Sequence, residues 1–379
     1  MNSSLKIGYL SAEDPKNKKV WSGTHYSIYK ALSTIGRVEI LGPVEPTFAL
    51  TVGKTINQLL LRLFKKRFDY RHSPLLSKAY AAFFSKKISE GSYDLLVAPA
   101  ASTEIAFLET NVPILYITDG TFKSCLNYHK SLTHLTANSI TLGNLIEQKG
   151  IQKSKKIIVS SEWAAKSLKE DYGASPDKIH VLPFGANFEV LPSEQELVFE
   201  IPVKWKLLFV GVYWDSKGGD IAFNAFNLLR ERGYAVSLTV VGCIPPEEVK
   251  DENITVIPFI DKNDAEGQKK LSAIFASHHL LLLPTRFDCT PIVINEASAF
   301  GIPSIVANTG GVKGHLTEGL NGFLVDYSDK GNKYAEIIEG LITEPLKYIS
   351  LRQSTRKLYI EKLNWHTWTK EFKKIIENF

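Results

Sequence analysis

The chain has 379 residues, a length typical of two domains or three, and its 45 basic and 40 acidic residues leave a net charge of only +5. Hydrophobic residues make up 44% and charged residues 22%, which is ordinary for a globular protein and excludes a disordered or fibrous chain. The positive surplus is too small to indicate a nucleic-acid-binding protein. The three cysteines lie far apart without a CxxC pair, which excludes a disulfide framework and a cysteine-rich zinc site.

The sequence shows no sign of export or of a membrane span. No long apolar stretch follows a basic segment at the amino terminus, so a secretory signal is not expected. The densest apolar run, at residues 280–283, is far shorter than the ~18 residues that a spanning helix needs. We therefore expect a cytoplasmic protein.

Short apolar runs alternate with longer helix-like segments along the whole chain, which predicts an α/β fold with parallel sheets. The predicted strands of a first series lie at residues 6–10, 38–41, 95–98, 114–118, 157–160 and 180–182. Those of a second series lie at residues 206–210, 237–241, 255–258, 280–283, 304–306 and 323–325. The polar stretch at 190–203 has no clear periodicity and indicates a linker, so we expect domains at residues 1–192 and 203–360.

The segment from Val20 to Gly36 follows the first predicted strand and has the pattern of a helix start. Ser22 or Thr24 can cap this helix, and Gly23 allows close approach of a ligand. His25 can donate to a substrate oxygen and is our candidate for acceptor binding. A histidine near a helix start is, however, more often structural.

Residues 57–89 form the most basic segment, with eight lysine and arginine residues against one acid, Asp69. Aromatic and aliphatic residues lie between the cations, which is typical of a surface that rests on an anionic membrane or binds an anionic acceptor. The alternatives are a solvated helix face, which is the more common case, and a nucleic-acid site. The candidates for membrane contact are Arg62, Lys65, Lys66 and Arg67.

A glycine-rich turn follows the predicted strand at 206–210 and contains Gly211 and Lys217. Glycine lets the backbone approach an anion, and the lysine ammonium neutralises it, so this turn is a candidate phosphate site. It matches neither the Walker A pattern nor GxGxxG. Taken alone, an ordinary turn is an equally good interpretation.

The most informative stretch runs from residue 281 to 303, where a buried strand enters a short loop and then a helix. We predict Thr290 as the N-cap and Pro291 as the first helical residue, followed by Ile292 and Val293. The N–H groups and the dipole at this helix start would lie at the carboxyl edge of a sheet, where open α/β folds bind ligands. This predicts that a phosphate is held there.

Two carboxylates flank this helix start. Asp288 lies in the loop and Glu296 in the second helical turn, so both can face one crevice and accept hydrogen bonds from sugar hydroxyls. From the residues alone, the plainer alternative is that Asp288 is a solubilising loop residue and that Glu296 pairs with a lysine.

Residues 361–379 have apolar side chains spaced at three and four residues, which predicts a helix packed on a core. The stripe consists of Trp368, Phe372, Ile375, Ile376 and Phe379. This helix either stays with the second domain or crosses back to the first.

Taken in this order, the segments resemble the family 4 glycosyltransferases, retaining enzymes of the GT-B architecture with two Rossmann-like domains that face a cleft. The resemblance covers nearly the whole chain. It rests on the stretches 158–165, 178–187, 209–218 and 309–322, and on an acid followed by seven residues and a glutamate, here Asp288 and Glu296. The order of the segments is more specific than any one of them.

The resemblance implies roles for the candidate residues. Glu296 would accept hydrogen bonds from the nucleotide ribose, Asp288 would contact the donor sugar, and Lys217 would neutralise the diphosphate leaving group. N–H groups after Pro291 would assist, and Gly23 would approach the donor from the first domain. The first domain would then bind the acceptor and the second a UDP- or GDP-type sugar nucleotide, without a metal or another cofactor.

Four positions depart from the family pattern. Asp288 is one methylene shorter than the usual glutamate, and Val212 stands where an arginine often assists the lysine. Pro291 replaces a frequent glycine and removes one N–H donor. Asp119 stands where a histidine normally lies beside the reacting centre; it either orients an acceptor hydroxyl, as a catalytic residue, or caps a turn.

We therefore expect a cytoplasmic enzyme, peripheral on the inner membrane face, that transfers a hexose from a nucleotide diphosphate to a hydroxyl acceptor with retention of configuration. The acceptor would be a glycan, a glycolipid or a small molecule, in surface polysaccharide or glycolipid synthesis. The rival interpretations are a nucleotide-sugar epimerase of the same architecture, a catalytically silent nucleotide-sugar or glycan-binding protein, and a nicotinamide-dependent oxidoreductase. The missing GxGxxG motif counts against the last of these.

Overall fold

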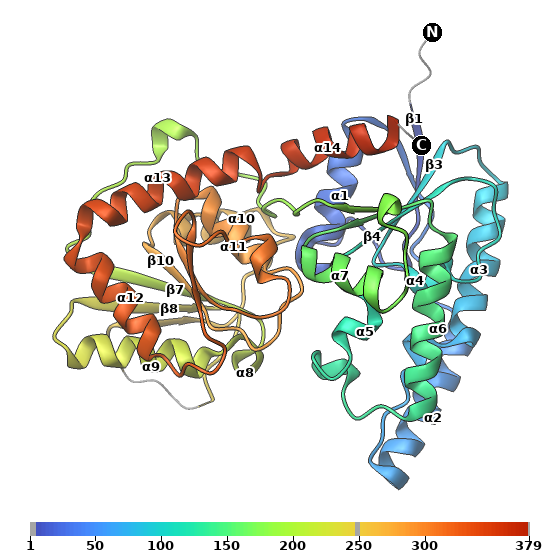
Figure 1. The fold of residues 1–379 in the computed structure, drawn as a ribbon, viewed down its shortest axis with the longest axis horizontal. Coiled ribbons are helices and arrows are strands. Elements are labelled where there is room, and N and C mark those ends of the chain that lie inside the picture. The colour runs from blue at the N-terminus through green and yellow to red at the C-terminus, as the bar shows by residue number, and fades with distance from the viewer. Residues whose placement is uncertain (1–4, 247–250, 378–379) are drawn as a thin grey trace. The chain divides into compact units, whose positions relative to one another are not determined.

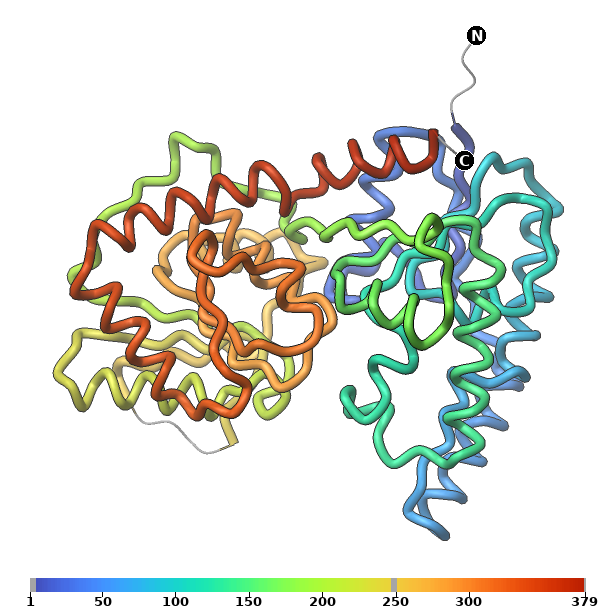
Figure 2. Tube along the Cα trace, in the orientation of Figure 1, coloured from blue at the N-terminus to red at the C-terminus, as the bar shows by residue number. Residues whose placement is uncertain are grey.

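The computed structural model describes residues 5–246 and 251–377 and contains two six-stranded sheets, each with all its strands parallel. The chain divides into two compact units: unit 1 is Met1–Leu182 with Thr369–Phe379, and unit 2 is Pro183–Trp368. Figure 1 labels the elements, and Figure 2 traces the chain through both units. The α/β architecture with parallel sheets is confirmed.

The sheet of unit 1 has the strand order β2-β1-β3-β4-β5-β6. Its strands are β1 (Leu5–Tyr9), β2 (Gly36–Ile40), β3 (Leu95–Pro99), β4 (Ile114–Thr118), β5 (Lys156–Val159) and β6 (Ile179–Val181). Its helices are α1 (Thr24–Ser33), α2 (Thr47–Phe64), α3 (Pro74–Ser89), α4 (Ser102–Ile105), α5 (Phe122–Cys125), α6 (Ala137–Lys153) and α7 (Glu162–Glu170). Helices α2, α3, α4 and α6 pack one against the next (Figure 1).

The sheet of unit 2 has the strand order β12-β11-β10-β7-β8-β9. Its strands are β7 (Trp205–Val210), β8 (Val236–Val241), β9 (Ile254–Ile257), β10 (Leu280–Leu283), β11 (Ser304–Ala307) and β12 (Gly322–Val325). The helices that follow are α8 (Trp214–Lys217), α9 (Gly219–Glu231), α10 (Ala265–Ala276), α11 (Ile292–Ala299), α12 (Asn332–Thr343), α13 (Pro345–Glu361) and α14 (Trp365–Glu377). All the predicted strands of both series are present, with bounds within two residues of the prediction.

Each sheet has one point where the order of strands reverses. In unit 1 this point lies between β1 and β3, and in unit 2 it lies between β7 and β10. Loops that leave the carboxyl ends of two such strands run to opposite faces of the sheet, and ligands bind between them in open α/β folds. The loops after β7 and β10 are therefore the first place to look for a site.

The division between the units lies at Leu182, earlier than the linker expected at 190–203. The residues after Leu182 belong to unit 2 because they contact its helices. Phe184 stacks on Trp365 with ring centroids 5.9 Å apart, and the Phe184 carbonyl accepts a hydrogen bond from Asn295 Nδ2 at 2.8 Å. The polar composition and missing periodicity of residues 190–203, on which the expected boundary was based, do not indicate these contacts.

The C-terminal helix α14 begins in unit 2, and its residues from Thr369 onward are assigned to unit 1. This agrees with a helix that crosses back to the first domain. Trp368 and Phe372 of the predicted apolar stripe are fully buried. Phe379, the last member of the stripe, lies outside the described residues.

Candidate functional site

Two loops of unit 2 leave the carboxyl ends of β7 and β10, which are neighbouring strands. The first loop contains α8 with Lys217, and the second runs from Pro284 to Pro291 and contains Asp288. Because the strands are parallel, both loops lie at the same edge of the sheet. Two motifs that are far apart in the sequence thus meet at the reversal of strand order.

Lys217 and Asp288 form an ion pair, with Nζ 2.5 Å from Oδ2. The side chain of Asp288 is 9% exposed and that of Lys217 is 25% exposed, so the pair is largely removed from water. A lysine ammonium has three N–H donors, and Asp288 takes one of them. The family resemblance implies a diphosphate contact for Lys217 and a sugar contact for Asp288, and in the structure the two side chains also contact each other directly.

Arg286 connects the two loops through hydrogen bonds. It was not among the residues predicted from the sequence. Its Nη1 donates to Asp220 Oδ1 at 2.9 Å and its Nη2 donates to Asp220 Oδ2 at 2.7 Å. Its backbone N–H donates to the Ser216 carbonyl at 2.8 Å. Because a bidentate pair fixes the geometry of both partners, the pair with Asp220 holds the first turn of α9 against the loop after β10, and the bond to Ser216 holds α8 there.

Gly211 and Gly218 provide the space that Lys217 needs. A Cβ atom on Gly211 would lie 2.7 Å from Lys217 Cγ and would displace the lysine side chain. Gly218 directly follows Lys217 with a φ of 74°, and a Cβ atom there would collide with the Pro284 carbonyl. Close approach of a donor to Gly211 stays a prediction, but the position of the lysine already requires this glycine.

The helix after β10 starts one residue later than predicted. Pro291 is the N-cap and Ile292 is the first helical residue, so Thr290 does not occupy the cap position. The N–H of Ile292 donates to the Thr290 carbonyl at 2.8 Å and is therefore engaged within the loop. Val293, the second helical residue, has an N–H group without an intrahelical acceptor. The helix ends as predicted, with Gly301 at a φ of 62°.

Glu296 lies on α11 and is almost completely buried. Its Oε1 accepts a hydrogen bond from Lys262 Nζ at 2.9 Å, so the lysine partner of the plainer alternative exists. Lys262 lies in the loop after β9, and Gln268 Nε2 donates to its carbonyl at 2.8 Å, which ties that loop to α10. Sequence reasoning missed Lys262 because a single loop lysine has no local pattern that indicates its partner.

Asp119 directly follows β4 at the carboxyl edge of the sheet of unit 1. Its Oδ2 accepts a hydrogen bond from Trp21 Nε1 at 3.1 Å. The turn after β4 is held by Thr118, whose hydroxyl donates to the Gly120 carbonyl at 2.7 Å. Asp119 therefore holds the loop before α1, and a catalytic role for it stays a prediction.

That loop has an unusual backbone. Trp21, Ser22 and Gly23 have consecutive positive φ angles of 46°, 56° and 89°. Gly23 is the N-cap of α1 and has no side-chain cap bond, so neither Ser22 nor Thr24 occupies the cap position that was predicted for them. The conformation costs about 1–3 kcal/mol at each non-glycine residue, and such strain is concentrated at functional sites.

His25 is buried beneath this loop. Its Nδ1 lies 2.9 Å from the hydroxyl of Tyr9, and its ring contacts that of Trp21 with centroids 5.3 Å apart. Burial lowers the pKa of His25 to about 4, so the imidazole is neutral at pH 7. His25 thus supports Trp21, and its contact with an acceptor stays a prediction.

The four cations predicted to face a membrane differ in their surroundings. Arg62, Lys65 and Lys66 are exposed and form no ion pair in the part of the chain that the structure describes. Arg67 is instead fixed to its own unit, because its Nη1 donates to the Lys130 carbonyl at 2.8 Å and its N–H to the His134 carbonyl at 2.8 Å. The first three therefore remain the candidates for a membrane contact.

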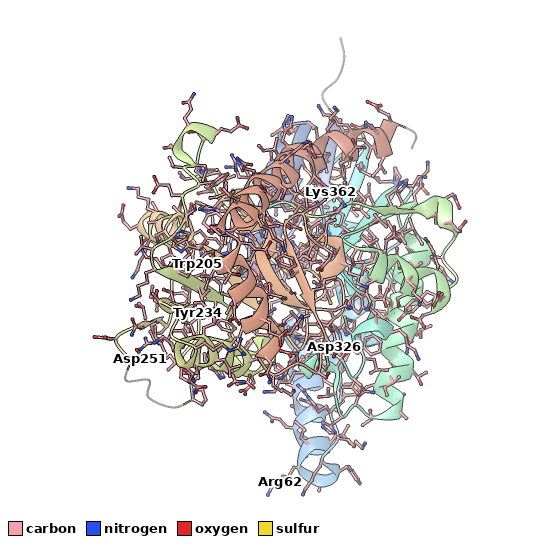
Figure 3. All side chains as sticks on the ribbon, turned by 60° about the vertical axis from the view of Figure 1, so that its left-hand side comes forward. Arg62, Trp205, Tyr234, Asp251, Asp326 and Lys362 are labelled. Atoms are coloured by element: carbon pink, nitrogen blue, oxygen red, sulfur yellow. The ribbon has the colours of Figure 1, made fainter. Side chains whose placement is uncertain are left out.

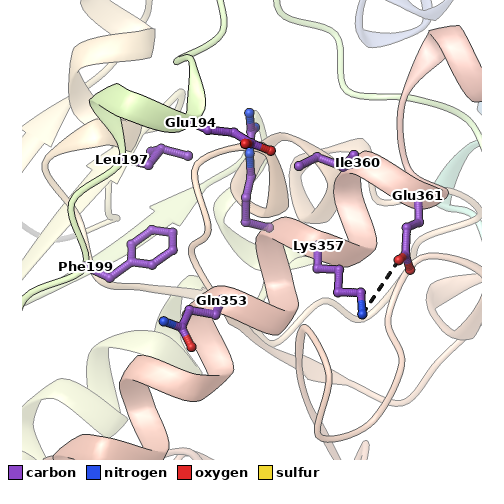
Figure 4. A pocket seen from close by; sticks show the side chains of 8 residues that line it. Glu194, Leu197, Phe199, Gln353, Lys357, Ile360 and Glu361 are labelled. Atoms are coloured by element: carbon purple, nitrogen blue, oxygen red, sulfur yellow. Dashed lines mark ion pairs between the residues drawn. The ribbon is translucent and has the colours of Figure 1, made fainter.

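A separate hollow of about 410 Å³ lies between α13 and residues 194–199 (Figure 4). Phe199 and Leu197 line one side, and the ion pair of Lys357 and Glu361, 3.9 Å long, lines the other. The residues at the carboxyl edge of the sheet do not line this hollow. It is therefore not part of the candidate site.

Residues 5–246 and 251–377 contain neither a membrane-spanning helix nor a cluster of metal ligands. No helix there has both the length and the apolar character that a membrane span requires. No cluster of three or more histidine, cysteine, aspartate or glutamate side chains there has a geometry that could hold a metal ion.

Residues 204–344, which include both lysine–carboxylate pairs, match the family model of glycosyl transferases group 1. A D-inositol 3-phosphate glycosyltransferase of Corynebacterium aurimucosum is 24% identical over 264 residues, 64% of this chain and 61% of that protein. An uncharacterized 41.2 kDa protein in the cps region of Klebsiella pneumoniae is 29% identical over 139 residues, 36% of this chain and 36% of that protein. The chain thus covers less than two thirds of the length of either relative.

Two solved structures resemble the chain over almost its full length. Sucrose-phosphate synthase of Thermosynechococcus elongatus has a TM-score of 0.70 at 15% identity, over 99% of this chain and 98% of that chain. The fold is that of the GT-B glycosyltransferases. Anabaena Alr3699/HepE, solved in complex with UDP and glucose, has a TM-score of 0.65 at 15% identity, over 99% of this chain and 100% of that chain. The expected pair of Rossmann-like domains is confirmed.

Proposed function

We propose that the protein is a glycosyltransferase that moves a hexose from a nucleotide diphosphate to a hydroxyl acceptor. The observation that carries the proposal is the Lys217–Asp288 pair at the reversal of strand order, within the segment that matches glycosyl transferases group 1. The donor is of UDP or GDP type. The complex of Anabaena Alr3699/HepE with UDP and glucose supports the UDP type.

Lys217 has the main catalytic role, because it stabilises the charge that develops during the reaction. As the bond to the sugar breaks, negative charge grows on the leaving diphosphate, and a preorganised cation at that position stabilises the transition state. Lys217 has N–H donors beyond the one that Asp288 accepts, and the Val293 N–H at the start of α11 adds another. Asp288 orients the ammonium with one oxygen and accepts from a hydroxyl of the donor sugar with the other.

Glu296 binds the ribose of the nucleotide. A carboxylate accepts hydrogen bonds at both oxygens, and Lys262 takes Oε1, which fixes the group for a ribose hydroxyl at Oε2. We further propose that the enzyme belongs to family 4 and retains the anomeric configuration. The acceptor hydroxyl then attacks from the face that the diphosphate leaves, and the leaving phosphate assists the removal of its proton.

The acceptor binds at unit 1. The strained loop with Trp21, its partner Asp119 and the supporting His25 lie at the carboxyl edge of that sheet, next to its own reversal of strand order. An aromatic side chain beside a carboxylate suits the apolar face and the hydroxyls of a sugar. We propose a lipid-linked acceptor in surface polysaccharide or glycolipid synthesis, with the enzyme peripheral on the cytoplasmic face of a membrane.

A panel of UDP-, GDP- and ADP-sugars tests the donor site by thermal protection and nucleotide release. We expect protection by one base type, and we expect Glu296→Gln to weaken donor affinity about ten-fold, since a charge-assisted hydrogen bond contributes about 1.5–3 kcal/mol. Glu266→Gln is the matched control, because its carboxylate forms an exposed pair with Lys269.

Each outcome of this panel has a distinct meaning. Nucleotide release that an acceptor accelerates supports the transferase. Protection without release would instead indicate a silent binding protein, and conversion of the sugar on an intact nucleotide would indicate an epimerase. No protection by any sugar nucleotide would overturn the proposal.

A further inference from the structure

Helix α2 of unit 1 exposes apolar side chains in its first turn and again from Ile56 to Phe64. Phe48, Leu59, Leu63 and Phe64 are between 53% and 76% exposed, and Ile56 is 39% exposed. The spacing of Phe48, Ile56, Leu59 and Leu63 places them on one side of the helix. An exposed apolar face such as that from Ile56 to Phe64 is typical of an interaction surface.

Helix α2 is anchored to the rest of unit 1 between its first turn and Asn57. Its buried residues are Ala49 and Gly53, and a Cβ atom on Gly53 would collide with the Tyr70 side chain, so the two segments are in close contact. Further along, Asn57 Oδ1 accepts from the Phe68 N–H at 2.9 Å. Beyond that contact the helix projects from its neighbours (Figure 1), with Arg62 at the projecting tip (Figure 3).

The charge of the projecting end is entirely positive. No acidic residue occurs between Glu45 and Asp69. Arg62, Lys65 and Lys66 are exposed there and, within residues 5–246 and 251–377, have no acidic partner. An apolar face beside unpaired cations complements a surface with apolar depth and negative headgroups.

We propose that the end of α2 docks on an anionic lipid surface. Leu59, Leu63 and Phe64 enter the boundary between headgroups and acyl chains, while the basic side chains bind lipid phosphates. A second copy of the chain fits this face less well, because it would bring two clusters of like charge together. The docking deepens the proposed function, on whose peripheral membrane association it rests, and would place unit 1 beside acceptors embedded in the membrane.

Co-sedimentation of the full chain with vesicles tests the docking. The vesicles consist of phosphatidylcholine alone or of phosphatidylcholine mixed with phosphatidylglycerol. We expect partition to the anionic vesicles only. The double substitution Lys65→Ala/Lys66→Ala weakens it about 25-fold, since each basic residue near an anionic surface contributes about five-fold, or about 1 kcal/mol. Leu63→Ser/Phe64→Ser weakens it about ten-fold or more, because it removes the buried apolar area.

Two control variants match these changes elsewhere on the surface. Lys166→Ala/Lys169→Ala removes the same charge from the exposed face of α7, and Leu346→Ser removes an apolar side chain that is 77% exposed on α13. Both should partition like the wild type. Thermal unfolding and protection by sugar nucleotides, measured on every variant, should stay unchanged, which separates docking from folding and from donor binding.

Three results would overturn the proposal. The first is no partition to anionic vesicles, and the second is equal partition to both vesicle types. The third is self-association that Leu63→Ser/Phe64→Ser abolishes without any binding to vesicles, which would assign the face to a second copy. Partition that only the two α2 variants reduce supports the proposal, whatever the donor assay shows.

Discussion

The ion pair of Lys217 and Asp288 can serve the stability of unit 2 or the reaction, and a double-mutant cycle separates the two roles. We predict that Lys217→Met and Asp288→Asn each reduce both the free energy of unfolding and turnover. The double variant should regain stability but not turnover. Both substitutions keep the approximate shape of the side chain, so that the removed charge is the main change.

The expected loss of stability follows from the burial of the pair. Removal of one partner from a buried ion pair costs about 3–5 kcal/mol, because the other charge loses its compensation. The Asp288 side chain is 9% exposed, but the Lys217 side chain is 25% exposed and keeps contact with water. We therefore expect about 2 kcal/mol for each single variant. In the double variant no charge is left uncompensated, and stability should return to within about 1 kcal/mol of the wild type.

The expected loss of turnover has a different origin. A group that is aimed at developing charge contributes about 10²–10³ in rate, or about 3–4 kcal/mol of barrier. This contribution disappears with the ammonium of Lys217, and Asp288→Asn does not bring it back. The double variant should therefore be as slow as Lys217→Met alone, although it unfolds like the wild type.

Urea unfolding and the release of nucleotide from a sugar nucleotide measure the two quantities on the same samples. Arg232→Met is the matched control, because Arg232 pairs with Glu339 at 2.7 Å at the opposite end of α9, with side chains 34% and 36% exposed. It should cost at most about 1 kcal/mol and leave turnover unchanged. A double variant that regains most of the wild-type turnover would refute the catalytic role and leave the pair purely structural.

Three further predictions concern other side chains. Lys262→Met should weaken donor affinity about ten-fold in a thermal protection assay, because the donor-site glutamate loses the bond that orients it, whereas the exposed control Lys269→Met should have no effect. Trp21→Phe and Asp119→Ala should each raise the KM for the acceptor without changing donor affinity, since both break the same hydrogen bond; unequal effects would show a separate role for the carboxylate. Burial raises the pKa of Glu104 from its usual 4.5 to about 7, so the folded chain binds the proton more tightly and stability is lost as pH rises between these values. Glu104→Gln should therefore be about 3 kcal/mol more stable than the wild type at pH 8 and nearly as stable as the wild type at pH 4.5, and equal stability at both pH values in urea unfolding would contradict this.

The strands could be predicted from the sequence because each of them is a local signal. A run such as Leu280–Leu283 is apolar throughout, since both faces of a central parallel strand are covered. The loops after β7 and β10 were also predictable, because Lys217 and Asp288 follow such runs within seven residues. The parallel direction of the strands then brings their carboxyl ends to one edge.

The remaining features depend on contacts between distant segments. Lys262 meets Glu296 only through the tertiary fold, and nothing near either residue in the sequence indicates the pair. The predicted cap at Thr290 failed because preference for a capping residue amounts to about 1 kcal/mol, which the geometry of a loop easily overrides. Trp21 was not recognised because its positive φ and its bond to Asp119 require coordinates.

The cations of the donor site in unit 2 and the cations at the end of α2 act over different distances, and ionic strength distinguishes the two. In unit 2, Lys217 and Lys262 are each paired with a carboxylate, so these four side chains have no net charge. Their effect on a diphosphate comes from N–H groups in fixed positions at short range, where salt screens little. At the end of α2 the cations are exposed and unpaired, and their attraction to a membrane acts over a distance that salt shortens to about 10 Å at 0.1 M. A rise in salt concentration should therefore release the protein from anionic vesicles while the affinity for the sugar nucleotide changes little. A parallel loss of both would mean that donor binding depends on long-range attraction, and the paired arrangement of the lysines would then not explain it.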